Sequence, residues 1–120
     1  MNITTSAQDF EMSNAIDQFV RDQLSSALKR LSEDVVAVDV FLKDTNGPKG
    51  GIDKHALIRV QLRNRQVIAL ETKHDDLYAA IRIGSKRAKR AARRQLRKSQ
   101  RIQKLRMRDR LGDSGMQTAS

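Results

Sequence analysis

Residues 35–43 read Val-Val-Ala-Val-Asp-Val-Phe-Leu-Lys, with valine or leucine at each even position from Val36 to Leu42. Asp39 and Lys43 share the opposite parity. Because successive side chains of a strand point to opposite faces, this alternation predicts a strand with one buried face that includes Val36. A face of this kind needs a covering layer, which the rest of the chain has to supply.

Two further alternating runs predict two more strands, at residues 55–63 and 66–73. The inward residues of the first run are Ala56, Ile58, Val60 and Leu62. Asn64-Arg65 separates the runs, which predicts a tight hairpin. A short β-prone start at residues 1–5 adds another strand. Residues 44–51 hold the only proline and three glycines, the composition of a flexible connector.

Two helical patterns complete the prediction. Ser13 is the expected N-cap of a helix that runs to about Leu31, with Asp17 in its first turns. Apolar residues recur in it at spacings of three and four: Ile16, Phe19, Val20, Leu24, Ala27, Leu28 and Leu31. Asp75-Asp76 precede the second helix, expected from about Leu77 to beyond Leu96. The order β-α-β-β-β-α predicts a two-layer α+β domain, a four-stranded sheet covered on one face by two helices.

Charge is divided unevenly along the chain. Residues 1–81 hold ten basic and twelve acidic side chains, whereas residues 82–120 hold fourteen basic and two acidic ones. The formal net charge of +10 therefore comes entirely from the C-terminal third. A concentrated positive field attracts polyanions, and nucleic acid is the leading candidate.

The second helix divides by angle into a packing side and a basic side. The packing side holds small and apolar residues: Leu77, Ile81, Gly84, Ala88, Ala91, Ala92 and Leu96. The basic side, where Ile83 is the exception, holds Arg82, Lys86, Lys89, Arg90, Arg93, Arg94, Arg97, Lys98 and Arg101. A solvated face usually mixes charge signs, and a membrane-surface helix needs larger apolar residues to insert. With few aromatic residues and no helix-turn-helix or zinc spacing, contact with phosphates and RNA shape fits best.

Residues 99–120 are expected to form a basic, flexible tail after a domain of residues 1–98. Packing residues become scarce after Leu96, and like charges four residues apart repel by a few tenths of a kcal/mol each. We expect this end to fray in the free protein and to order along a phosphate backbone.

Other classes of protein have little support. Cysteine is absent, which excludes disulfides and thiolate metal sites. His55 and His74 are expected to be surface residues at strand ends, and Asp75-Asp76 to be a helix start rather than a metal site. We predict no catalytic residue, no cofactor, no metal and no small-molecule substrate. No signal peptide or membrane-spanning run is visible, which predicts a cytoplasmic protein with no membrane partner.

Residues 76–81, Asp-Leu-Tyr-Ala-Ala-Ile, follow the last predicted strand and lead into the basic helix. This Asp-x-Tyr-x-Ala-Ile pattern, the Asn2-Ile3-Thr4 start and the Ser13-Asn14-Ala15-Ile16 helix opening resemble the ribosome hibernation promoting factor family, which includes protein Y, over about residues 1–98. The family usually continues the pattern with Asp, where this chain has Arg82. The family's second helix also keeps some acids, whereas this chain has none from Arg82 to Met107.

The resemblance implies a bacterial stationary-phase or stress factor that binds the small ribosomal subunit and its rRNA, in the channel of mRNA and tRNA, and inhibits translation. A monomer is expected off the ribosome. The implied rRNA-binding residues are those of the second helix, with Lys29 and Arg30 at the end of the first as weaker candidates: Lys86, Lys89, Arg90, Arg93, Arg94, Arg97, Lys98 and Arg101. The competing hypothesis is a structural protein that binds RNA or DNA generally, without preference for ribosomes.

Overall fold

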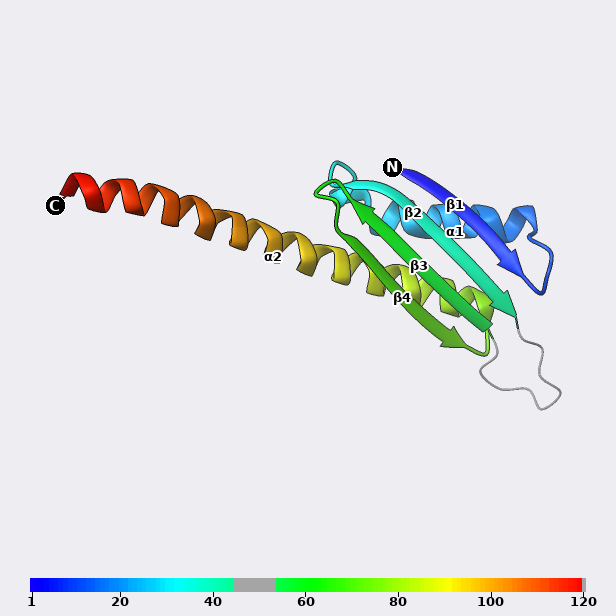
Figure 1. Cartoon of the computed structure of the whole chain (residues 1–120). Helices are drawn as coiled ribbons and strands as arrows, with labels where there is room; N and C mark the ends of the chain where they lie inside the picture. The colour runs from blue at the N-terminus through cyan, green and yellow to red at the C-terminus, as the bar shows by residue number, and fades with distance from the viewer. Residues whose placement is uncertain (45–53, 120) are drawn as a thin grey trace.

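The computed structural model describes residues 1–44 and 54–119, and side chains as far as residue 109. The predicted connector at residues 44–51 lies, apart from Asp44, outside the described residues. The elements follow the predicted order (Figure 1): β1 Asn2–Gln8, α1 Asn14–Ala27, a 3₁₀ turn η1 Lys29–Leu31, β2 Val35–Asp44, β3 Lys54–Leu62, β4 Val67–His74 and α2 Leu77–Ala119.

The four strands form one sheet in the order β1-β2-β3-β4. β1 pairs in parallel with β2, while β2 with β3 and β3 with β4 pair antiparallel. Both helices lie on the same face of this sheet, and the other face carries none of the described helices (Figure 1). The predicted two-layer α+β fold is confirmed.

The start of β2 differs from the predicted alternation. Val35 is 2% exposed and Val36 is 46% exposed, whereas Val38, Val40 and Leu42 are buried as predicted. The pairing with β3 shifts register between Val35 and Ala37. A bulge of this kind inserts one extra residue and reverses the parity before it, so the prediction that Val36 faces inward is wrong.

The turn between β3 and β4 is longer than the predicted two residues. Leu62 N donates to Gln66 O at 2.8 Å, and Arg65 N donates to Leu62 O at 3.0 Å, which leaves three residues, 63–65, in the loop. Arg65 has a φ of 72°, in the left-handed region. A three-residue hairpin loop commonly ends in such a residue, whose backbone corrects the twist between the strands.

Helix α1 begins as predicted and ends earlier. The Ser13 hydroxyl accepts a hydrogen bond from Ile16 N at 3.1 Å, so the predicted N-cap is confirmed. The helix ends at Ala27, and a 3₁₀ turn carries the chain on to Leu31. With three residues per turn, this segment keeps Leu28 and Leu31 on the core side while the chain turns toward β2.

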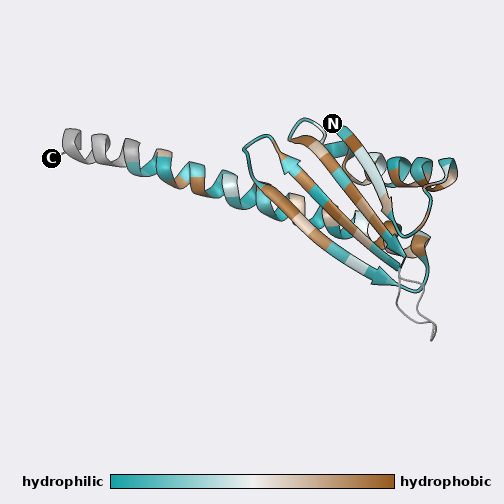
Figure 2. Cartoon of the chain, turned by 45° about the vertical axis from the view of Figure 1, so that its right-hand side comes forward, coloured by the Kyte–Doolittle hydropathy of each residue, from teal (hydrophilic) through white to brown (hydrophobic). Residues whose placement is uncertain are grey.

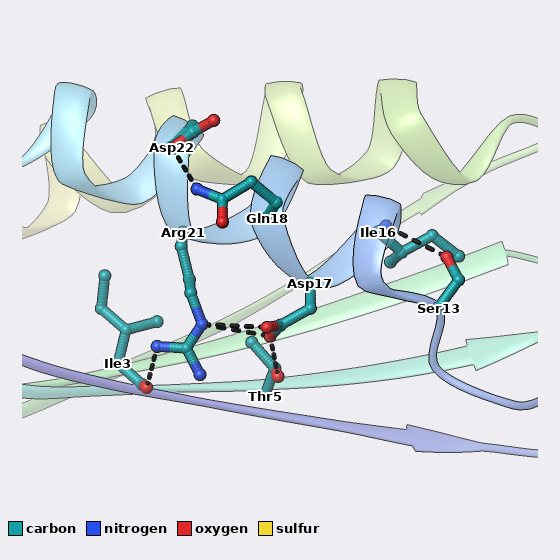
Figure 3. A network of polar contacts seen from close by, with 8 residues as sticks. All are labelled: Ile3, Thr5, Ser13, Ile16, Asp17, Gln18, Arg21 and Asp22. Atoms are coloured by element: carbon teal, nitrogen blue, oxygen red, sulfur yellow. Dashed lines mark hydrogen bonds and ion pairs between the residues drawn. The ribbon is translucent and has the colours of Figure 1, made fainter.

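A polar network fastens α1 to the edge strand β1 (Figure 3). Thr5 Oγ1 donates to Asp17 Oδ1 at 2.5 Å, and Arg21 Nε donates to both carboxylate oxygens of Asp17. Arg21 Nη1 also donates to the backbone oxygen of Ile3 at 2.9 Å. The Thr5 hydroxyl, followed by the Arg21 guanidinium, holds the pKa of Asp17 below its usual value, because both stabilise the charged carboxylate.

The core lies between the sheet and the two helices. Its fully buried residues come from α1, the residue after it, β2, β3 and α2: Val20, Leu24, Leu28, Val35, Val38, Val40, Leu42, Ala56, Ile58, Val60, Leu62, Ala80, Ile81, Ala88 and Ala92. Ile3 from β1 and Ile68 and Leu70 from β4 pack against this cluster while partly exposed. The predicted inward residues of β3 are all buried in it.

Helix α2 is continuous from Leu77 to Ala119 and projects past the sheet (Figure 1). The radius of gyration is 19.3 Å, against about 14 Å for a compact chain of this length. Figure 2 shows hydrophilic residues prevailing along the coloured section of the projecting part. The expectation that the chain frays from residue 99 in the free protein stays a prediction.

Candidate nucleic-acid interface

The residues 76–81 that open α2 serve the packing of the helix. Asp76 Oδ1 accepts a hydrogen bond from Tyr78 N at 3.1 Å, so Asp76 caps the helix as predicted. The Tyr78 ring meets Phe19 of α1 edge to face, with ring centroids 4.8 Å apart. Ala80 and Ile81 are buried in the core. The motif thus sets the position and direction from which the basic helix starts.

The side of α2 that faces the body is lined with small residues. Gly84, Ser85, Ala88 and Ala92 are buried, and a Cβ on Gly84 would lie 3.0 Å from Ile58 Cδ1. The Ser85 hydroxyl donates to Ile81 O at 2.8 Å, which satisfies it within the helix. Small residues let the helix axis approach the sheet closely, so the packing side predicted from the sequence is confirmed.

The opposite side of α2 presents cations to solvent. Lys86, Arg90, Arg94, Arg97, Lys98 and Arg101 are exposed, and Lys89 and Arg93 are half-buried. Within the described part of the chain, none of these eight side chains forms a hydrogen bond or an ion pair. Ile83 lies among them, 37% exposed. We call these eight residues, with Arg82, the basic face.

Six members of the basic face gather around one shallow groove along the helix: Arg90, Arg93, Arg94, Arg97, Lys98 and Arg101. Lys86 and Lys89 lie nearer the N-terminus of α2 and outside the groove. Neighbouring cations three or four residues apart repel one another, and an anion laid along the groove would relieve this repulsion. The groove follows the helix from Arg90 to Arg101, an extent that suits a charged polymer better than a small molecule.

Arg87 is a cation of α2 with a different role. Its Nη1 donates to Glu71 O at 2.9 Å and to Thr72 Oγ1 at 2.8 Å, both in β4. It therefore fastens the helix to the edge strand of the sheet and lies outside the basic face. Helical spacing alone does not separate Arg87 from the basic face, because it lies within about 20° of Lys98; its contacts with β4 do.

Lys29 and Arg30 lie apart from the groove. Both are exposed in η1, a different element from the basic face. The segment that follows η1 is joined to the β3–β4 hairpin, because Arg63 Nε donates to Glu33 O and Arg63 N to Asp34 O, each at 2.8 Å. The structure therefore places these two cations at the hairpin end of the sheet.

Two cations near this end were not among the predicted binding residues. Arg65 is exposed at the tip of the hairpin, and Arg106 lies on α2 beyond the hydrogen bond of Ser99 to the hairpin. The sequence does hold a signal for Arg106. Helical periodicity places it on the packing side of the helix, in line with residues 92, 95, 99 and 102. Both cations therefore belong to the junction of hairpin and helix rather than to the basic face.

Other kinds of site are not supported by the described residues. Within them, no group of three or more His, Asp or Glu side chains could hold a metal ion. His55 Nδ1 lies 3.5 Å from Glu71 Oε1, which also pairs with Lys73 Nζ at 3.5 Å. His74 Nδ1 lies 2.7 Å from Asp75 Oδ1 and accepts a hydrogen bond from Asp76 N at 3.0 Å. None of the described helices is both long enough and apolar enough to span a bilayer.

The fold and the surface together define a small two-layer α+β protein that carries a strongly basic helix. The family described as sigma 54 modulation protein / S30EA ribosomal protein matches residues 3–100. This match spans most of the chain, so the protein belongs to that family, and the resemblance to hibernation factors is confirmed. No curated protein sequence matches the chain.

Several solved structures are similar to this one, among them the following two. The N-terminal domain of protein Y from Thermus thermophilus has 25% sequence identity and a TM-score of 0.66, over 78% of this chain and 98% of that one. A ribosomal subunit interface protein from Coxiella burnetii has 16% identity and a TM-score of 0.61, over 76% of this chain and 92% of that one. The second likeness is one of fold alone.

Proposed function

We propose that this protein is a ribosome hibernation factor that binds the small ribosomal subunit through the basic face of α2. It contacts rRNA in the channel of mRNA and tRNA, and so inhibits translation in stationary phase or under stress. It acts in the cytoplasm, without catalysis and without a cofactor. Family membership and the names of the two similar structures, protein Y and a ribosomal subunit interface protein, support a ribosomal partner.

The single observation that carries the proposal is a row of unpaired cations on a helix whose other side is packed. Arg90, Arg94 and Arg97 are exposed and have no partner among the described residues, although acids are plentiful elsewhere in the chain. Because Ala88 and Ala92 are buried beneath them, their backbone is held in place before any ligand arrives. Preorganised guanidinium groups match the phosphate geometry of a nucleic acid.

Folded RNA suits this surface better than the other polyanions. The chain has one Tyr and three Phe, and Phe19 and Tyr78 already contact each other, so aromatic platforms for unstacked bases are scarce. A helix with a small-residue packing side also has little apolar surface to insert into lipid. Recognition by phosphate contacts and RNA shape requires neither.

Ribosome binding by matched charge variants tests the proposal. Arg90→Gln, Arg94→Gln and Arg97→Gln together remove three charges from the basic face. The control is Lys43→Gln, Arg59→Gln and Lys73→Gln, which removes three charges from the uncovered face of the sheet, where strand register and alternation place all three. Co-sedimentation with small subunits and in-vitro translation are measured for both.

We expect the first variant to bind at least about tenfold more weakly and to release translation, while the control stays within about twofold of the parent. The log–log salt dependence should also become shallower, by about 0.7 to 0.9 for each phosphate that is no longer neutralised. Translation that continues at saturating protein would contradict the proposal. Equal affinity for duplex DNA and for ribosomes at one salt concentration would favour the general nucleic-acid binder instead.

A further inference from the structure

A cleft lies between the β3–β4 hairpin and α2. Figure 1 shows this hairpin beside α2 where the helix leaves the body. One wall is the hairpin, with Asn64 and Gln66. The other wall belongs to α2 and consists of Ser99, Ile102, Gln103, Arg106 and Met107. The cleft lies on the packing side of α2, whereas the basic face looks away from it, so the two surfaces are distinct.

The inner end of the cleft is closed by hydrogen bonds. Gln66 Oε1 accepts from Ser99 Oγ at 2.7 Å and from Gln95 Nε2. Gln66 N in turn donates to Asn64 Oδ1 at 3.1 Å. These bonds fasten the hairpin to the helix, so this part of the cleft has a structural role and its polar groups are already used.

The outer end of the cleft has the opposite character. Arg106 continues the line of residues 88, 92, 95, 99 and 102, which is small, polar or apolar up to this point. A cation on this line is not explained by the basic face, because it points to the opposite side of the helix. Within the described residues, Arg106 and Gln103 have no hydrogen bond or ion pair.

A second cation lies beside the cleft at the hairpin tip, between Asn64 and Gln66, although it is not itself among the residues that line the cleft. Arg65 sits at the tip with a φ of 72°, a conformation that favours glycine or asparagine over arginine. Its backbone is bonded within the turn and its side chain has no partner among the described residues. The adjacent Arg63 fixes the hairpin from the other side through Glu33 O at 2.8 Å. The tip is therefore a rigid support for an exposed guanidinium.

We propose that the outer cleft is a second RNA-binding site, which takes the phosphodiester backbone of an RNA segment between the hairpin and α2. Arg106 contacts a phosphate from the helix wall, Arg65 contacts the emerging backbone from the hairpin tip beside the cleft, and Gln103 offers an amide to a phosphate oxygen or a ribose 2′-hydroxyl. This inference rests on the proposed function and extends it. With cations on the cleft side and on the basic face, α2 is suited to be enclosed by RNA rather than to lie on its surface.

The test uses the full-length chain and small ribosomal subunits, with Arg65→Asn, Arg106→Gln and the double variant. Asparagine tolerates a positive φ, so Arg65→Asn removes the charge without straining the turn. Arg59→Gln, on the uncovered sheet face, is the control for the removal of one charge. We expect each single variant to bind about five- to tenfold more weakly and the control to stay within about twofold. The double variant should weaken binding by less than the product of the two single effects, because both residues hold one segment.

The triple basic-face variant separates the two possible failures. If it weakens binding while Arg65→Asn and Arg106→Gln behave like Arg59→Gln, the cleft proposal is overturned and the proposed function stands. If the triple variant binds normally, the proposed function itself fails. A photo-crosslinking residue placed at Gln103 gives an independent reading: a cross-link to rRNA supports the cleft, and one only to a ribosomal protein overturns it.

Discussion

The two halves of α2 carry the same kind of charge in opposite surroundings. Residues 77–99 hold nine cations and no acid, and residues 100–109 hold four cations and Asp109. The first half buries Ile81, Ala88 and Ala92 against the body. In the second half every described side chain is exposed, including Ile102, Leu105 and Met107.

This difference shows how a domain can carry a surface whose neighbouring cations repel one another. In the first half, burial of the packing side offsets the repulsion between neighbouring cations, so the basic face is ordered before binding. In the second half nothing described opposes that repulsion, and we expect order to come from a partner. On the proposed function, the first half would be a preformed site and the second half a site completed by its ligand.

The largest expected effect comes from a charge placed on the buried side of the first half. Ala88→Glu should lower the free energy of unfolding by about 3 kcal/mol or more, because it buries a carboxylate without a partner at a fully buried position. Gln100→Glu puts the same side chain on the projecting half and should change it by less than about 0.5 kcal/mol. Urea denaturation measures both, and equal decreases would refute the division of α2.

Ending the chain after Ser99 removes the projecting half and should separate stability from binding. The whole buried core lies within residues 20–92, so the unfolding free energy should stay within about 0.5 kcal/mol of the parent. Affinity for small subunits, measured by co-sedimentation, should fall about tenfold with a shallower salt dependence, because fewer phosphates are neutralised. Unchanged affinity would show that the projecting half takes no part in binding.

Circular dichroism tests the same comparison by measuring the helix content of the protein with and without rRNA. The free full-length protein should show less helix than the 43 residues of α2 and the 14 of α1 would give, and rRNA should raise it. A helix signal that is already complete without RNA would contradict the fraying of residues beyond 99.

A smaller effect is expected where the two halves meet. Gln66→Ala removes the acceptor of Ser99 and Gln95 and should cost about 1 to 2 kcal/mol of unfolding free energy. Gln100→Ala, which deletes an amide with no described partner, is the matched control. Hydrogen exchange at residues 95–99 should accelerate in the first variant only; unchanged exchange would show that this junction is held by packing alone.

The smallest expected effect is the dependence of the body's folding stability on pH. For the projecting half, in contrast, the expected dependence is that of RNA binding on salt. The pKa of Asp17 is lowered in the folded protein, so its contribution to stability is present above its ordinary pKa of 3.8 and is lost as the pH falls through the lowered value. The stability difference between the parent and Asp17→Asn should therefore shrink between about pH 5 and about pH 2, where the carboxylate takes up its proton. Parallel melting curves across this range would contradict the role of the Thr5–Asp17–Arg21 network.

The fold was largely predictable, because it follows from local patterns. Alternation in β3 placed Ala56 to Leu62 correctly, and the caps Ser13 and Asp76 marked both helix starts. The errors lie where a partner strand intervenes. The bulge that exposes Val36 depends on its pairing with β3, and the longer hairpin loop depends on how Leu62 bonds to Gln66.

The sequence predicted the charge of the candidate site but not the contacts that its cations make with other elements of the protein. Helical spacing separated the basic face from the packing side, because both are properties of one helix. The role of Arg87 depends on β4 lying beside it, and the Glu71 oxygen that it binds is 16 residues earlier in the chain. The cleft between Asn64 and Arg106 likewise joins a hairpin to a distant part of α2, which no local pattern reports.

The amino-acid order alone established the types of the elements, the side of each that is buried, and the concentration of cations in the last helix. These are short-range properties, since they depend on side-chain period and on charge along the chain. The packed chain alone established which cations are free, which are used to fasten α2 to β4, and where the hairpin meets the helix. These depend on distances between residues that are remote in the chain, and such distances exist only after the core has formed.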